Sequence, residues 1–295
     1  MIDNRKFLAD IGSSNPDERF SAWRQAGNVS PSVIPGLGQL AGGADPGVAR
    51  AAAEALTTMV HSVGKDPAAP HRAEVVKGLL ALAGGASTPV RVHALRLLSN
   101  IAGEDSVPAV AVYLSSPDLR EEAIYALERI PGKASIQAVV AAYPSTSADF
   151  KPRMLAALGH RQAAEALPLV VEAMRSQDKN IVLAAVLAYG RIGVKPATAP
   201  AYPGPDTFTG WQRTGQMDAM LRFADAMVKQ GNTADARAIY ATALKSAEER
   251  WQCAAIVGLA KIGDAEAADA ILPWFKSGHR TVRITAQQAW RRISA

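Results

Sequence analysis

Hydrophobic residues recur along this chain at the spacing of an amphipathic helix, and the pattern returns about every thirty residues. Each unit has a reference position that is followed by small or apolar residues at +3, +6, +7 and +10. Steps of three and four residues place these side chains on one face of a helix. The interval between 182 and 252 leaves room for one inserted unit. The reference residues are Arg91, Arg120, Lys151, Val182, Gln252 and Arg283.

A second amphipathic segment precedes each of these helices, as in 73–84 and 166–176. Short polar breaks separate the two segments, and Ser87 and Asp178 stand in breaks of this kind, where a short oxygen-bearing side chain caps the next helix. Gly193 is expected to end one helix. Each unit is therefore predicted to be a hairpin of antiparallel helices. Neither helix can bury its apolar stripe alone, so the hairpins must stack. The predicted fold is all-α, a right-handed α-solenoid.

The segments 44–56 and 88–98 show the repeating frame most clearly: a proline, an apolar residue, an arginine, and then Ala and Leu at helical spacing. This frame resembles the HEAT repeat, an armadillo-like helical repeat, and in particular the short bacterial HEAT-like form first noted in phycobilin lyase subunits. The resemblance covers most of 16–193 and 247–295. It implies a solenoid with an inner face made by the second helices, and it carries no specific chemistry.

Two segments depart from the frame. Residues 222–244 resemble a tetratricopeptide (TPR) hairpin, with Ala236, Tyr240 and Ala243 at the spacing of its second helix. Residues 194–210 contain four prolines and cannot be helical. The sequence thus predicts one continuous solenoid in four parts: a HEAT-like array at 1–193, a proline-rich loop at 194–210, a TPR-like hairpin at 211–246 and C-terminal HEAT-like repeats at 247–295.

Composition supports packed helices and sets limits on chemistry. The 295 residues carry a formal charge of +5, which permits an anionic partner without requiring one. The single cysteine, Cys253, excludes an internal disulfide. The longest strongly apolar run, 181–190, is about half of a membrane-spanning helix, so no membrane insertion is expected. No leader is evident, and we expect a cytoplasmic protein, or a secreted or periplasmic one if a leader was removed.

The five histidines are not arranged as a metal site. None forms a His-x-x-x-His pair and none is followed by Glu. The HEAT-repeat iron hydroxylase that modifies a lysine-derived residue needs His-Glu pairs, so this assignment is rejected. Phosphate-binding and dinucleotide-binding fingerprints are also missing. We therefore expect no cofactor and no catalytic residue.

The candidate partner-binding residues form two groups. The first lies on the inner face, at +5 and +9 of the repeat helix, where stacked units would align a row of cations. Last-turn cations also satisfy the helix dipole, which is the alternative reading of that row. The second group lies in and after the proline-rich loop, where aromatic residues either anchor a partner or hold the loop against the array. The candidates are Arg96, Tyr125, Arg129, His160 and Arg191, then Tyr202, Phe208 and Trp211.

Three functions remain open. The first is a non-enzymatic scaffold that binds a protein or peptide on its inner face, and the sequence favours it because stacking alone is enough. The second is a nucleic-acid-binding solenoid, which fits the basic pI of about 9.4 but not the apolar inner positions such as Leu187 and Val257. The third is a bilin-lyase-like enzyme subunit, for which no tetrapyrrole pocket is evident.

Overall fold

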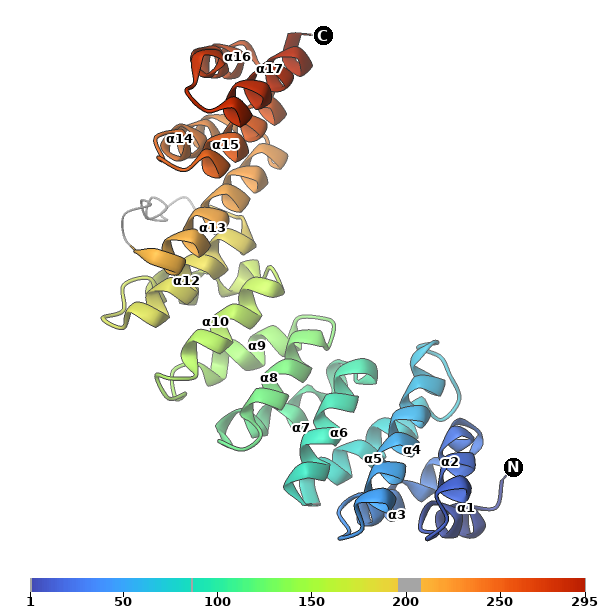
Figure 1. Cartoon of the computed structure of the whole chain (residues 1–295). Helices are drawn as coiled ribbons and strands as arrows, with labels where there is room; N and C mark the ends of the chain where they lie inside the picture. The colour runs from blue at the N-terminus through green and yellow to red at the C-terminus, as the bar shows by residue number, and fades with distance from the viewer. Residues whose placement is uncertain (1, 86, 196–207, 295) are drawn as a thin grey trace. The chain divides into compact units, whose positions relative to one another are not determined.

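The structure is a computed structural model that describes residues 2–85, 87–195 and 208–294. Every regular element in these ranges is a helix (Figure 1). The chain forms two compact units, Met1–Thr146 and Ser147–Ala295, which are described separately. The predicted all-α class is confirmed. None of the predicted boundaries coincides with the boundary between the units, so the four-part division by repeat type stays a prediction.

Unit 1 consists of helical hairpins in which long second helices, such as α4, α6 and α8, pack against one another. Short 3-10 turns introduce or extend several of the first helices. The elements are α1 (Asn4–Ile11), α2 (Pro16–Arg24), η1 (Ala26–Asn28), η2 (Pro31–Val33), α3 (Ile34–Ala41), α4 (Pro46–Gly64), α5 (Arg72–Gly85), α6 (Thr88–Ile101), η3 (Glu104–Ser106), α7 (Val107–Ala111), η4 (Val112–Ser115), α8 (Arg120–Arg129) and α9 (Ala134–Ala142).

Unit 2 follows the same plan, with one unusually long helix, α13. Second helices again pack against second helices, as α10 does against α12 and α15 against α17. The elements are α10 (Lys151–His160), η5 (Ala164–Ala166), α11 (Leu167–Ala173), α12 (Lys179–Ile192), α13 (Gly210–Lys229), α14 (Thr233–Leu244), α15 (Glu249–Ile262), α16 (Ala265–Ile271), η7 (Leu272–Lys276) and α17 (Arg280–Ser294).

The core consists of the positions that the repeat frame assigns to packing. Every residue at +3 of the six predicted repeat helices is fully buried, and at +7 the same holds to within 1% in five of the six. Burial of these apolar side chains stabilises the stack by about 25 cal/mol per Å² of apolar surface. The +3 residues are Ala94, Ala123, Met154, Ala185, Ala255 and Ala286, and the five +7 residues are Leu98, Leu127, Leu158, Tyr189 and Leu259.

Two of the predicted helix caps form and one does not. Asp178 accepts hydrogen bonds from the backbone N–H groups of Asn180 and Ile181, at 2.8 and 3.4 Å. Gly193 ends α12 in the left-handed conformation, with φ of +67°. Ser87 occupies the N-cap position of α6, but its side chain makes no capping hydrogen bond. The position of the α6 N-cap was therefore predicted correctly, but the side-chain hydrogen bond expected there does not form.

Candidate partner-binding surface

Three helices of unit 2, α10, α12 and α13, lie side by side and run in the same direction. Each neighbouring pair of these helices makes a close contact at a glycine, and the two contacts lie 31 residues apart in the sequence. A Cβ atom on Gly159 would lie 2.8 Å from Ala188 Cα, and one on Gly190 would lie 2.5 Å from the carbonyl oxygen of Ala219. Only helices that lack a side chain at the contact can approach so closely. Glycine at these two points therefore draws the three helices into one continuous surface.

The pairing of Gly190 with Ala219 reveals a repeat unit that the sequence frame missed. Ala188 is the +6 residue of α12, and Ala219 stands in the equivalent place on α13. The reference position of α13 is then Arg213, which lies 31 residues after Val182 and so continues the spacing. Its packing positions are all buried. They are Gln216 at +3, Ala219 at +6, Met220 at +7 and Phe223 at +10.

The third residue of the cation row on this surface is Arg222, at +9 of α13. It follows His160 and Arg191 at intervals of 31 residues, and sequence reasoning did not find it. The repeat pattern of α13 was not recognised in the sequence, because Gln, Met and Phe occupy the +3, +7 and +10 positions, where the other repeats usually have Ala, Leu and Ile. The interval alone would have found it.

A cavity of about 380 Å³ is lined by His160, Arg191 and Arg222, and we call it the cationic hollow after its arginine and lysine side chains. It contains both His160 and Arg191, which the sequence proposed. Among the described residues, the side chains of Arg191 and Lys229 take part in no ion pair, and Arg222 Nε donates to Asp218 Oδ2 at 2.8 Å. The lining residues are Gly159, His160, Gln162, Gly190, Arg191, Arg222, Asp225, Ala226 and Lys229.

The single carboxylate in the cationic hollow, Asp225, is engaged by two donors. Its Oδ1 accepts from the Tyr240 hydroxyl at 2.5 Å, and its Oδ2 accepts from Lys261 Nζ at 2.6 Å. Burial of the phenol, followed by this hydrogen bond, raises the pKa of Tyr240. The negative charge of Asp225 is thus already compensated by Lys261, and Arg191 and Lys229 keep the hollow electropositive.

An apolar groove of about 400 Å³ lies at the opposite, N-terminal end of the same helices. Trp211 borders it with 76% of its surface exposed, the largest exposure of any large apolar side chain described. Leu183 and Leu187 of α12 form its floor. The lining residues are Ala148, Asp149, Pro152, Asp178, Asn180, Leu183, Ala184, Leu187 and Trp211.

Phe208 does not share the exposure of Trp211. It is 5% exposed and packs in a cluster with Leu183 and Val186 of α12. This is the second of the two roles considered for the loop aromatics, contact with the array, so Phe208 is not available to a partner in this structure. Tyr202 lies outside the described residues.

The predicted residues of unit 1 lie on the equivalent positions of α6 and α8. Arg96 at +5 forms a two-pronged ion pair with Glu122, at 2.9 and 2.8 Å, which raises the pKa of the arginine. Tyr125 at +5 is 41% exposed, and the Arg129 guanidinium lies 5.5 Å from its ring centroid. Arg96 is therefore committed to Glu122, whereas Tyr125 and Arg129 form an exposed cation–π pair.

Charge is divided unequally between the two units. Residues 1–146 carry 13 basic and 14 acidic side chains, and residues 147–295 carry 19 basic and 13 acidic ones. The net positive charge of the chain therefore resides in unit 2, the unit with the cationic hollow.

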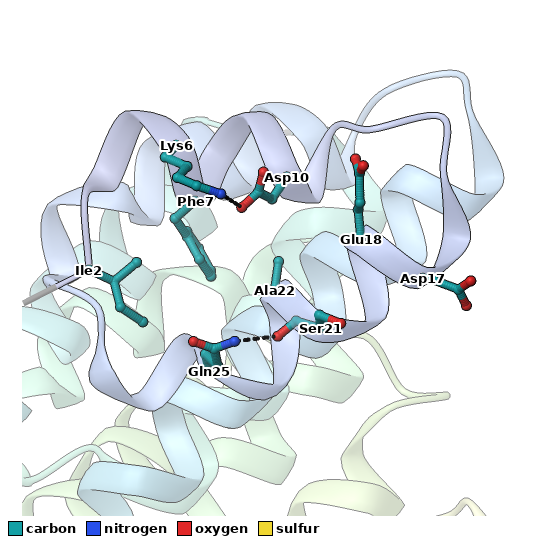
Figure 2. A pocket seen from close by; sticks show the side chains of 9 residues that line it. All are labelled: Ile2, Lys6, Phe7, Asp10, Asp17, Glu18, Ser21, Ala22 and Gln25. Atoms are coloured by element: carbon teal, nitrogen blue, oxygen red, sulfur yellow. Dashed lines mark hydrogen bonds and ion pairs between the residues drawn. The ribbon is translucent and has the colours of Figure 1, made fainter.

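A further pocket, of about 450 Å³, lies between α1 and α2 in unit 1 (Figure 2). Lys6 Nζ lies 3.1 Å from Asp10 Oδ2, and the Ser13 hydroxyl donates to Glu18 at 2.5 Å. Figure 2 shows Asp17 directed away from the pocket. With one lysine against Asp10, Asp17 and Glu18, the lining is net acidic, in contrast to the cationic hollow.

The described residues contain neither a candidate metal site nor a candidate membrane-spanning helix. No group of three His, Cys, Asp or Glu side chains there is placed to hold a metal ion. None of the described helices is both long enough and apolar enough to span a membrane.

The repeat class follows from this geometry and from a match to a known family. Residues 76–151 match the family model for HEAT repeats, which confirms the predicted resemblance to HEAT repeats over this part of the chain. No curated protein matches the sequence.

Two solved structures resemble the whole chain. A structure described as Kap95p bound to RanGDP contains a chain with 14% identity and a TM-score of 0.51, and the match covers 99% of this chain and 43% of that chain. A crystal structure of an engineered protein gives 21% identity, 100% and 89% coverage, and a TM-score of 0.46. The first likeness shows a shared helical-repeat fold. The chain spans less than half of that neighbour.

Proposed function

We propose that this chain is a non-enzymatic scaffold that binds a protein or peptide partner on the second-helix surface. Its HEAT-repeat fold is of a kind that presents long surfaces made by successive helices. The Kap95p structure concerns a protein that binds RanGDP, and the resemblance to it supports the fold on which our proposal rests.

The observation that carries the proposal is the exposure of Trp211 beside the apolar groove. A tryptophan with 76% of its surface in water has no packing role in the described part of the chain. Tryptophan is also among the residues that contribute most to protein–protein interfaces. A groove with an apolar floor next to it supplies the desolvated surroundings in which such an anchor is effective.

A nucleic acid is the second candidate, because unit 2 is basic. Phosphate backbones are bound by rows of cations that follow the strand. On the exposed strip of α13, however, Asp218 and Asp225 alternate with Arg222 and Lys229. Alternating charges of this kind favour a short segment of defined sequence over a continuous polyanion.

The test is affinity capture from cells of the source organism, followed by reconstitution with the purified partner. The variant is Trp211→Ala, and the control is Phe20→Ala, which removes an aromatic side chain that is 50% exposed on α2. We expect the partner to bind the control normally and Trp211→Ala about 10-fold to 100-fold more weakly, because hot-spot aromatic residues contribute about 2 kcal/mol or more.

Failure to enrich any protein above an unrelated helical-repeat bait of equal charge would refute the proposal. A nuclease-sensitive complex whose affinity falls steeply with salt would favour the nucleic-acid alternative instead.

A further inference from the structure

We infer that unit 2 binds an extended peptide segment of two parts: an apolar side chain in the groove beside Trp211, and carboxylates about five residues further along in the cationic hollow. This inference rests on the proposed function and specifies its ligand. Three features of unit 2 support it: the continuity of the surface, the distance between its ends and the charge at one of them.

The groove and the hollow are the two ends of one surface. On α12, Asn180, Ala184, Leu187 and Arg191 are at least partly exposed and follow one another at helical steps of four, three and four, while Lys179 and Val182, which are also not buried, lie outside this line. The four residues of the line run from the groove to the hollow without interruption. A strip on α13 runs parallel to them, through Gly215 and Asp218, and ends at Arg222 and Lys229.

The surface between the groove and the hollow includes small residues on all three helices. Ala156 on α10, Ala184 on α12 at the edge of the groove, and Gly215 on α13 are all partly exposed, and the larger side chains Leu187 and Asp218 lie beside them. Small side chains between two recesses leave room for a backbone to pass. A chain bound at one end can therefore reach the other along the helices.

The length of the surface sets the spacing of the two parts of the ligand. Trp211 and Arg222 are eleven residues apart on one helix, which corresponds to about 16 Å at 1.5 Å per residue. An extended peptide advances about 3.3 Å per residue. About five residues therefore separate an anchor at Trp211 from a side chain that reaches the hollow.

The charge of the hollow specifies acidic side chains. Three of its basic side chains, His160, Arg191 and Lys229, lie in the last turn of their helices, where the helix dipole alone accounts for a basic residue. Arg222 lies about two turns before the end of α13, where the dipole does not account for it, and its Nε pairs with Asp218 on the same helix. The convergence of all four on one cavity, with Asp225 already bonded to Lys261 and Tyr240, matches a carboxylate ligand.

The experiment selects peptides from a random phage-displayed library on the full chain and then measures the affinity of the enriched peptides by fluorescence anisotropy. We expect enriched sequences to share an apolar residue and acidic residues about five positions away. Enrichment of sequences without this arrangement, or no enrichment, would overturn the inference.

Charge-reversal variants test where the acidic part binds. Arg191→Glu and Lys229→Glu should each weaken binding at least about tenfold, or about 1.4 kcal/mol. A peptide with lysine in place of its acidic residues should recover affinity for Lys229→Glu. Lys245→Glu is the matched control, because it reverses an exposed cation at the end of the neighbouring α14 and changes the net charge by the same amount as Arg191→Glu and Lys229→Glu.

The outcomes separate this inference from the proposed function. Capture of the cellular partner that depends on Trp211 but not on Arg191 or Lys229 would keep the scaffold function and refute the two-part ligand. The inference would also be refuted if Lys245→Glu weakened peptide binding as much as Arg191→Glu and Lys229→Glu do. Tighter binding of duplex DNA than of any selected peptide would refute it too. Circular dichroism of each variant establishes that the helices are intact.

Discussion

The contact between Gly190 and Ala219 should control both the stability of unit 2 and the shape of its binding surface. A methyl group at position 190 would lie 2.5 Å from the Ala219 carbonyl oxygen and 2.8 Å from its Cβ. Both are backbone or backbone-attached atoms, so no side-chain rotation relieves the overlap. In Gly190→Ala, α12 and α13 must therefore move apart.

The magnitude follows from two opposing contributions. Overpacking of a tight contact costs about 1–3 kcal/mol. Replacement of a helical glycine by alanine returns up to about 1 kcal/mol through helix propensity. Because the overlap at Gly190 is with backbone atoms, the cost lies at the upper end of that range, about 2–3 kcal/mol. The net loss is then about 1–2 kcal/mol, which lowers the Tm by about 2–8 °C for a unit of this size. Thermal and urea unfolding followed by circular dichroism measure it.

Gly215→Ala is the matched control, because Gly215 lies at the same helix pair. A Cβ there would lie 3.5 Å from Leu187 Cδ2, an ordinary contact. The propensity gain then stands alone, and this variant should be more stable by about 0.5–1 kcal/mol. The two substitutions are chemically identical and should have opposite signs. A Gly190→Ala protein as stable as wild type would refute the close approach of α12 and α13.

Three further predictions concern buried groups. The imidazole of His93 lies 3.2 Å from the Ala53 carbonyl oxygen, and burial lowers its pKa. Its contribution is complete above about pH 6.5 and is lost as the pH falls through the lower folded pKa, so His93→Gln should flatten the acid side of a stability–pH curve. Burial raises the pKa of Tyr189 to about 12, above the value of about 10 in an unfolded chain. Stability should therefore fall as the pH rises from about 10, and less so in Tyr189→Phe, as urea unfolding would show. Phe208→Ala should cost about 3 kcal/mol of unfolding free energy, whereas Trp211→Ala should leave stability within about 0.5 kcal/mol; equal effects on stability would contradict their assigned roles.

The packing face of the repeat could be predicted because burial follows directly from helical periodicity. Ala94 and Leu98 are fully buried, as their +3 and +7 places require. The same frame places Tyr125 at +5 and Arg129 at +9, and both are exposed. An alternation of this kind depends only on local geometry, which the sequence contains.

The cationic hollow could not be predicted in full, because it depends on how closely helices of successive repeats within unit 2 approach one another. The close contact between α12 and α13 at Gly190 is possible because this residue has no Cβ atom, and the hydrophobic periodicity of the sequence does not indicate it. The frame also failed on α13, where Gln216, Met220 and Phe223 fill the packing positions. The predicted TPR-like pattern began at residue 222, so the first half of α13 was not recognised as part of a repeat helix.

The position and length of α13 explain why the cationic hollow lies in this part of unit 2 and not among the regular repeats. The helix packs against α12 on one side and against α14 and α15 on the other, so it stands in the row of second helices. It nevertheless continues past the usual length, and its extra turns carry Asp225 and Lys229. Asp225 binds Tyr240 and Lys261 from the next two helices and so fixes that extension in place. A regular second helix ends at about its +10 residue, and the cation at +9 then lies at an open helix end. The added length of α13 supplies Asp225, Ala226 and Lys229 to the lining of the cationic hollow. The row of basic residues at helix ends is therefore bordered here by a further stretch of helix, which gives the site a defined boundary.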